Sequence, residues 1–240
     1  MPLVSVDGAG FDGAWTVASG IRGWLTRDQA RMLWDRACVL GEGATIIEIG
    51  SHQGRSTVVL ARAAQEVGAR VTAIDPFVDG RLFGGPRTRD LFEANTAAAG
   101  VTGTVTLLAE YSTRARPDWS DRIDLLYIDG KHDYWTFSDD LRWSAFLAPG
   151  GEILVHDSFS SIGVTSGILV RVLPSRRYTY LDRAGSLARF ALRPPTMRDR
   201  MRVLAQLPWF ARNVVVKILL RLRLGPVTRV LRHEGPYDPY

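Results

Sequence analysis

The chain has 240 residues, of which 46% are hydrophobic and 23% are charged, and its formal net charge is +5. This composition is typical of a globular protein with one well-buried core, and the length falls short of two full domains. A single cysteine, Cys38, excludes an internal disulfide framework and a cysteine-based zinc site, and it fits a reducing, cytoplasmic setting. We find no run of about 18 uncharged apolar residues and no basic-then-apolar leader. We therefore expect neither a membrane-spanning helix nor a standard secretory signal.

The positive charge is concentrated at one end of the chain. Residues 1–192 carry 20 basic and 22 acidic side chains, a balance of −2, whereas residues 193–240 carry 10 basic and 3 acidic, a balance of +7. A nucleic-acid enzyme more often has a basic face around its active site. The nearly neutral main body therefore favours a small-molecule substrate. We predict a loosely held lead-in at 1–25, a main domain at 26–192 and a basic, apolar helical extension at 193–240.

The first predicted helix begins with a capping box, in which Thr26 and Gln29 satisfy free backbone N–H groups, and it extends to about residue 40. Strands and helices then alternate. We predict strands at 45–50, 70–75, 104–109, 123–129 and 152–157, helices at 54–65, 89–99, 134–147 and 163–173, and a closing hairpin from 177–181 and 186–192. In the helix at 134–147 we expect Phe137, Leu141 and Ala145 to point inward. The alternation predicts an α/β fold with a Rossmann-like, doubly wound, mostly parallel sheet and an antiparallel hairpin at its end.

A glycine turn joins the first strand of this alternation to its helix. Gly50 allows a tight turn, Gly54 lets the helix start approach closely, and backbone N–H groups of the turn face a ligand. The pattern is neither the phosphate-binding G-x-x-x-x-G-K-[ST] nor the dinucleotide-binding G-x-G-x-x-G. Glu48, just before the turn, can accept from the amino group of an amino-acid-bearing ligand. The alternative is a packing turn that binds nothing.

Asp75 ends the second strand, one strand–helix–strand unit after Glu48. In this architecture an acidic residue at that place accepts hydrogen bonds from the ribose hydroxyls of an adenosine. The alternative is a solvated carboxylate at the end of a strand.

Asp129 ends the fourth strand and Asp157 the fifth. Parallel strands end at one edge of a sheet, about 5 Å apart. Two carboxylates placed there can share a hard cation such as Mg²⁺. His156 precedes Asp157, and its imidazole is a poorer ligand for Mg²⁺ than for Mn²⁺ or Zn²⁺. The alternative is a pair of strand-end aspartates without a metal.

Four segments together resemble class I S-adenosylmethionine-dependent methyltransferases, and the resemblance covers about residues 21–192. They are EIGSHQGRST, AIDPF, YIDGKHDY and LAPGGEILVHD. Asp129-x-x-His132-x-Tyr134 is similar to metal-dependent sugar O-methyltransferases of the macrocin and mycinamicin type, and to the cephalosporin-hydroxylase-like group. Those sugar enzymes carry two consecutive acids after the fifth strand, where this chain has His156 and Asp157.

The resemblance implies a role for each matching position. Methionine contacts would come from Glu48, Gly50, Ser51, Gly54 and Ser56, the ribose contact from Asp75, and the adenine surroundings from Pro76, Phe77, Glu110, Tyr111 and Ser112. A divalent cation would lie at Asp129, Asp157 and His156. His132 would be the general base, because a sugar hydroxyl has a high pKa and must lose its proton as the methyl group arrives.

We therefore expect an S-adenosylmethionine-dependent O-methyltransferase that acts on a sugar or glycoside, by analogy a mannoside in polysaccharide or glycolipid assembly. Three alternatives remain open. They are a methyltransferase for catechol-like phenols, a nucleic-acid methyltransferase that binds its substrate through the basic extension, and a nucleotide-binding scaffold protein without enzymatic activity.

The extension itself allows two interpretations. It is an oligomer interface or a lid on the main body, or it attaches peripherally to anionic lipid at the inner face of a membrane. In a helix at 209–225, Arg212 and Arg223 fall on one side and Lys217 and Arg221 nearly opposite, so charge is not cleanly segregated. We expect a homo-oligomer, no nucleic-acid partner, and a mobile lid at 78–88.

Overall fold

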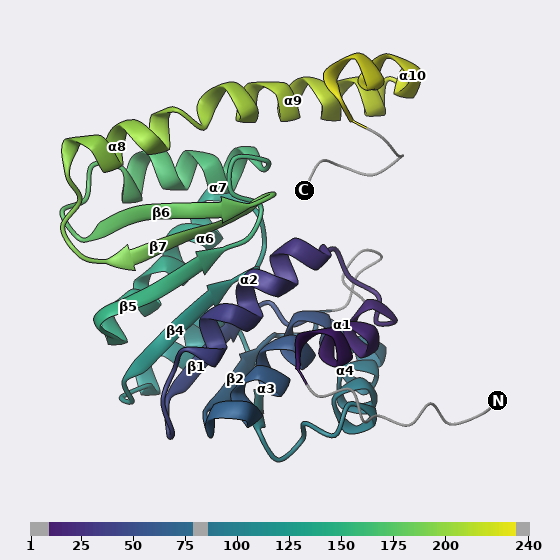
Figure 1. The fold of residues 1–240 in the computed structure, drawn as a ribbon, viewed down its shortest axis with the longest axis vertical. Coiled ribbons are helices and arrows are strands. Elements are labelled where there is room, and N and C mark those ends of the chain that lie inside the picture. Colours follow the sequence, from purple (N-terminus) through teal and green to yellow (C-terminus); the bar gives the residue numbers. More distant parts are fainter. Residues whose placement is uncertain (1–9, 79–85, 234–240) are drawn as a thin grey trace.

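The structure, a computed structural model, describes residues 10–78 and 86–233. A seven-stranded sheet with the order β3-β2-β1-β4-β5-β7-β6 runs through the molecule (Figure 1). Its strands are β1 (Thr45–Ile49), β2 (Arg70–Ile74), β3 (Val105–Leu108), β4 (Ile123–Ile128), β5 (Leu147–Val155), β6 (Tyr178–Ala184) and β7 (Leu187–Leu192). Strands β1 to β5 pair in parallel, and β7 is antiparallel to both β5 and β6. The predicted Rossmann-like sheet and its closing hairpin are thus confirmed.

Helices cover both faces of this sheet. One face carries α1 (Phe11–Ser19), α2 (Arg27–Cys38) and α3 (Arg55–Val67), with α4 (Pro86–Ala98) beside α3. The other carries α6 (Tyr134–Asp140), α7 (Ile162–Gly167) and α8 (Met197–Leu204), and the short α5 (Ser112–Ala115) follows β3. Successive side chains of one strand enter opposite layers, so Ile46 packs with α1–α3 and Ile47 with α6 and α7. Burial on both faces explains why the central strands are nearly continuous apolar runs.

The predicted loose lead-in is wrong for residues 11–19, which form helix α1. Phe11, Ala14 and Ala18 are buried at helical spacing, and the Phe11 ring lies edge-on to Trp34 with ring centroids 6.1 Å apart. The glycine- and alanine-rich composition of this segment hides the pattern, because small residues give a weak hydrophobic signal. Residues 1–9 lie outside the described part of the chain, as do residues 79–85 of the predicted lid.

The helix predicted at 134–147 changes its geometry halfway. Regular helix α6 ends at Asp140 and a 3₁₀ helix follows from Leu141 to Phe146. Phe137 and Leu141 are buried as predicted, but Ala145 is exposed and Trp143 is buried instead. A 3₁₀ helix has three residues per turn, so the inward face departs from the 3.6-residue period on which the prediction rested.

The C-terminal extension is helical, as predicted, and consists of α8, α9 (Leu207–Arg221) and α10 (Gly225–Thr228). Figure 1 shows it as a long arm that lies along β6 and α7 and ends beyond the sheet. By length and composition alone, the helical segment Met197–Arg221 passes the test for a membrane-crossing helix, because an 18-residue window within it has a mean hydropathy of 1.4. This differs from the expectation that the chain has no such segment. The difference arises because two basic residues interrupt the apolar run.

Candidate active site

The carboxyl ends of the five parallel strands meet at one edge of the sheet. This edge carries the glycine turn after β1, Asp75 after β2, Asp129 after β4, and His156 and Asp157 after β5. Ligands of open α/β sheets bind in this position. The structure therefore brings the predicted donor-binding turn and the predicted acid–base residues to the same edge.

The end of β1 lies directly against the end of β4. Gly50 has a φ of 91°, and a β-carbon on it would overlap the carbonyl group of Asp129. The Asp129 N–H donates to the Ile49 carbonyl oxygen at 2.8 Å, and the Gly50 N–H donates to the Ile74 carbonyl oxygen at 2.9 Å. Only glycine fits at position 50, because both the backbone conformation and the close approach exclude a side chain.

Asp75 supports the glycine turn from β2. One oxygen of its carboxylate accepts the His52 N–H and the other accepts the Phe77 N–H, each at 2.8 Å. A carboxylate oxygen has two lone pairs, so each oxygen can still accept a ribose hydroxyl. Asp75 is half-buried and is thus open to a ligand at the place the sequence predicted.

Glu48 and Ser56 lie underneath the turn. The Glu48 side chain is fully buried, and the hydroxyls of Ser56 and Thr57 donate to its carboxylate. Burial raises the pKa of Glu48 to about 7, although these hydrogen bonds act in the opposite direction. In this arrangement Glu48 and Ser56 bind each other, which differs from the expectation that both face the methionine part of a ligand.

The residues predicted around the adenine fall into two groups. Glu110 and Tyr111 are exposed and Pro76 is half-buried, whereas Phe77 packs edge-on against Phe92 in the interior. Ser112 is also buried, and its hydroxyl donates to Asp140 at 2.5 Å.

Asp140 is 1% exposed, and burial raises the pKa of its carboxyl group to about 6.

Two aspartates and two histidines form a cluster at the sheet edge. His132 Nδ1 lies 2.7 Å from Asp157 Oδ2, and its Nε2 lies 3.4 Å from Asp129 Oδ1. His156 Nδ1 lies 3.1 Å from the same Asp129 oxygen. His132 is 43% exposed, whereas His156 and Asp157 are almost fully buried. The four predicted residues therefore form one connected cluster, in which each side chain contacts at least one of the others.

The cluster is strongly coupled. Burial alone would lower the pKa of His132, but its hydrogen bonds with Asp129 and Asp157 raise that pKa to about 10. Burial works against ionisation of Asp157, yet His132 and His156 hold its pKa well below the usual range. Without another positive charge, His132 is thus a protonated imidazolium held by two carboxylates. A cation at the carboxylates would compete with that proton.

Gln29 determines which nitrogen of His156 carries hydrogen. The backbone N–H of Thr26 donates to Gln29 Oε1 at 2.9 Å, so this oxygen is the acceptor end of the amide. His156 Nε2 lies 3.3 Å from the same oxygen and must donate to it. Neutral His156 therefore turns the lone pair of Nδ1 toward Asp129, where a cation or a proton would satisfy it.

The donor set fits a divalent cation. Ligand atoms of Asp129, His132 and His156 lie within 4.8 Å of one another. Asp157, predicted as a ligand, instead bonds to His132 and accepts the Ser160 hydroxyl at 3.0 Å. One carboxylate with imidazole nitrogens suits Mn²⁺ or Zn²⁺ better than Mg²⁺.

The sequence analysis missed several supporting residues. Tyr127 donates its hydroxyl to Asp129 Oδ2 at 2.8 Å, Ser160 donates to Asp157, and Gln29 is held by the Ser186 hydroxyl at 3.1 Å. Tyr127 could have been found, because it lies two residues before Asp129 and so on the same face of β4. Gln29 gave no such signal, because its sequence context only indicated a helix cap.

Comparisons with known proteins match part of the sequence and the fold. Residues 47–158 match a sequence family described as a methyltransferase domain. Among solved structures, SAH-bound PaMTH1 from Podospora anserina has a TM-score of 0.61 at 12% identity, covering 80% of this chain and 89% of that chain. An O-methyltransferase from Bacillus cereus in complex with SAH has a TM-score of 0.56, and TomG from Streptomyces achromogenes in complex with SAM has 0.54. Each of these two is 19% identical and covers 80% of this chain and 92% of its own.

At these identities the solved structures show the fold alone, and the chain has the fold of these methyltransferases. The match to the methyltransferase-domain family covers residues 47–158, slightly less than half of the 240-residue chain.

The raised pKa of Glu48 makes a prediction about stability. The folded state holds the Glu48 proton more tightly than the unfolded state, so this group stabilises the fold at low pH and loses that contribution as the pH rises from about 4.5 to about 7. Glu48→Gln should remove on the order of 2 kcal/mol of this decline. Urea unfolding at both ends of this pH range measures the effect, with exposed Glu110→Gln as the control. Equal pH dependence in wild type and Glu48→Gln would contradict the buried, protonated carboxyl.

Proposed function

We propose that the protein methylates a hydroxyl group of a sugar or glycoside, with His132 as general base and a divalent cation held at Asp129 and His156. The observation that carries this proposal is the contact of His132 Nδ1 with Asp157, 2.7 Å long, at the sheet edge beside the glycine turn. Transfer to oxygen is further supported by the solved structures of similar fold, of which the Bacillus cereus protein and TomG are O-methyltransferases.

The donor site is assigned to the glycine turn and Asp75. Backbone N–H groups between Gly50 and Gly54 would hold the methionine part together with Ser51, and Asp75 would accept the ribose hydroxyls. Glu48 and Ser56 would act from below, by fixing the turn. Bound S-adenosylmethionine supplies the methyl group for transfer to the acceptor oxygen. The adenine assignment of Pro76, Phe77, Glu110, Tyr111 and Ser112 stays a prediction.

His132 has the geometry of an oriented base. Its Nδ1–H donates to Asp157, so the lone pair of the neutral ring lies on Nε2, which is 3.4 Å from Asp129 Oδ1. When Nε2 accepts the hydroxyl proton, the buried Asp157 carboxylate stabilises the imidazolium. His132 is 43% exposed, which leaves the ring accessible to an acceptor. The acceptor hydroxyl gives its proton to His132 as its oxygen bonds to the methyl group. The bond between that methyl group and the sulfonium sulfur breaks, which leaves the thioether of S-adenosylhomocysteine.

The proposed cation explains how His132 acts as a base at neutral pH. A divalent cation held by Asp129 and His156 would supply positive charge that lowers the pKa of an acceptor hydroxyl and competes with the proton on His132. Asp129 is prepared for this role because Tyr127 fixes its second oxygen. His156 is prepared because Gln29 directs the Nδ1 lone pair toward Asp129.

Metal binding and base catalysis can be separated by variants. His132→Ala should lower kcat by about 10²–10⁴-fold and leave the Mn²⁺ affinity within a few-fold of wild type. Asp129→Asn should lose Mn²⁺ binding, whereas Asp118→Asn, which changes an exposed aspartate in the 3₁₀ helix Arg116–Asp118, should not. Labelled methyl transfer to glycoside acceptors with and without EDTA, and calorimetry with Mn²⁺, give the two readouts.

Each outcome of that experiment is decisive. Full turnover after chelation would exclude a required metal ion. Full activity of His132→Ala would exclude His132 as the general base. Loss of Mn²⁺ affinity in His132→Ala would make His132 a ligand instead. Labelling of phenols or RNA but not glycosides would change the acceptor class.

Gln29 is predicted to position His156 for the cation. Removing a side chain that orients a metal-binding histidine typically lowers metal affinity by about 10–100-fold, and Gln29→Ala should do so here. Thr26→Ala is the matched control, because it removes the helix cap, at a cost of about 1 kcal/mol, but keeps Gln29. Calorimetry with Mn²⁺ measures both. Equal Mn²⁺ affinity in Gln29→Ala and Thr26→Ala would show that the amide does not orient His156.

A further inference from the structure

The arm formed by α8 and α9 carries an uncovered apolar stripe. Its members are separated by alternating steps of four and three residues, and every one of them is exposed. We call this set the outer stripe: Met197, Met201, Leu204, Pro208, Ala211, Val215, Ile218 and Leu222. The exposed fraction reaches 73% at Met197 and 62% at Leu222. Residues three and four apart share one side of a helix, so the outer stripe is a continuous line along the arm.

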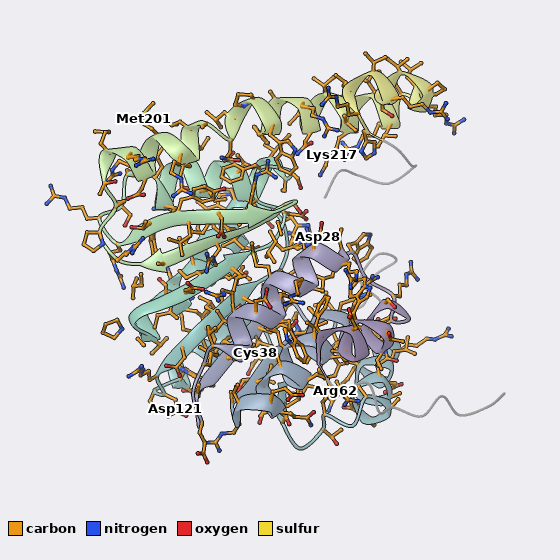
Figure 2. The ribbon with its side chains drawn as sticks, viewed as in Figure 1. Asp28, Cys38, Arg62, Asp121, Met201 and Lys217 are labelled. Atoms are coloured by element: carbon orange, nitrogen blue, oxygen red, sulfur yellow. The ribbon has the colours of Figure 1, made fainter. Side chains whose placement is uncertain are left out.

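The opposite side of the arm fixes it to the main body. Val203, Asn213 and Val216 are buried, and the Asn213 amide donates to the Phe159 carbonyl oxygen at 3.1 Å. Arg183 donates to Gln206 at 2.8 Å. Figure 2 shows Met201 on the outer side of the arm and Lys217 on the side of the main body. The outer stripe is therefore held facing away from the protein.

Basic side chains border the outer stripe. At 100° per residue, Arg198 and Arg212 fall along one border of the outer stripe. Arg223, which follows the end of α9 at Arg221, is also exposed, whereas the Arg200 guanidinium donates to the carbonyl oxygens of Leu173 and Ser175 on the main body. Residues 193–233 contain ten basic side chains and a single acidic one, Asp199. Lys217, which blurred the charge segregation in the sequence, lies on the inner side and does not interrupt the apolar line.

This charge pattern selects among occupants of the stripe. A second copy of the chain would bring arginine borders against arginine borders, and like charges oppose such pairing. An anionic lipid surface attracts the same arginines while the apolar line enters the headgroup region. The arm consists of two consecutive helices with a break at Ala205 and Gln206, and at 1.5 Å per residue its 25 residues offer a contact of at most about 37 Å.

We propose that the outer stripe of α8 and α9 docks the enzyme on an anionic lipid surface, with the arm parallel to that surface. The arm does not cross the bilayer in this arrangement, because Asn213 and Val216 remain packed on the main body. Through the bond from Asn213 to Phe159, the arm also borders the sheet edge that carries Asp157.

Vesicle flotation of the full chain tests this directly. Wild type should float with vesicles that contain about 30 mol% phosphatidylglycerol in phosphatidylcholine, should not float with phosphatidylcholine alone, and should be released by about 0.5 M NaCl. Ile218→Asp combined with Val215→Asp should weaken binding at least about 10-fold, because two charges enter the apolar line. Arg198→Glu combined with Arg223→Glu should weaken it several-fold. Val39→Asp is the matched control, since Val39, which follows the end of α2, is 65% exposed, and the variant should bind like wild type.

Two results would overturn the proposal. One is flotation that the stripe variants leave unchanged. The other is a concentration-dependent dimer of wild type, seen by sedimentation velocity, that Ile218→Asp dissociates, because the stripe would then bind a second copy. Thermal melting and S-adenosylhomocysteine binding of each variant verify the fold. Flotation requires no methyl transfer, so its failure is distinct from failure of the proposed function.

Discussion

The close approach of two backbone segments underlies the whole site. Gly50 at the end of β1 lies against the carbonyl group of Asp129 at the end of β4, with no space for a side chain between them. The same contact joins the glycine turn, to which we assign the methyl donor, to the first residue of the acid–base cluster. Asp75 then fixes the turn from the neighbouring strand through the His52 N–H. Donor and acceptor chemistry are therefore coupled by the sheet itself, without a flexible intermediate.

The cluster beyond that contact keeps two carboxylates and two imidazoles in a largely buried place. Burying charge is costly unless each group has partners. Here Tyr127 bonds to Asp129, Ser160 to Asp157 and Gln29 to His156, so neutral groups occupy the outer sides of the cluster. The inner sides face each other and remain available for a proton or a cation. This division explains why the cluster can be both rigid and reactive.

Much of this was predictable from the sequence because it follows from topology. Parallel strands end at one edge, so Asp75, Asp129 and Asp157 had to converge once the strands were recognised. The contacts that depend on side-chain packing were not predictable. The sequence around Gln29 indicates a helix cap, but its side chain also orients a histidine 127 residues away. The sequence likewise gives no sign that the Asp140 carboxylate is buried and accepts the Ser112 hydroxyl. Helix α1 was not predicted, because alanine and glycine give little periodic hydrophobic signal.

The account depends most on the claim that the glycine turn and Asp75 hold the adenosyl donor beside this cluster. Calorimetric titration with S-adenosylhomocysteine measures that directly. We predict saturable binding at one site in wild type and at least about 10-fold weaker binding in Asp75→Ala, since the ribose hydroxyls lose a charged acceptor. Absence of binding to wild type, or equal affinity in Asp75→Ala, would contradict the account.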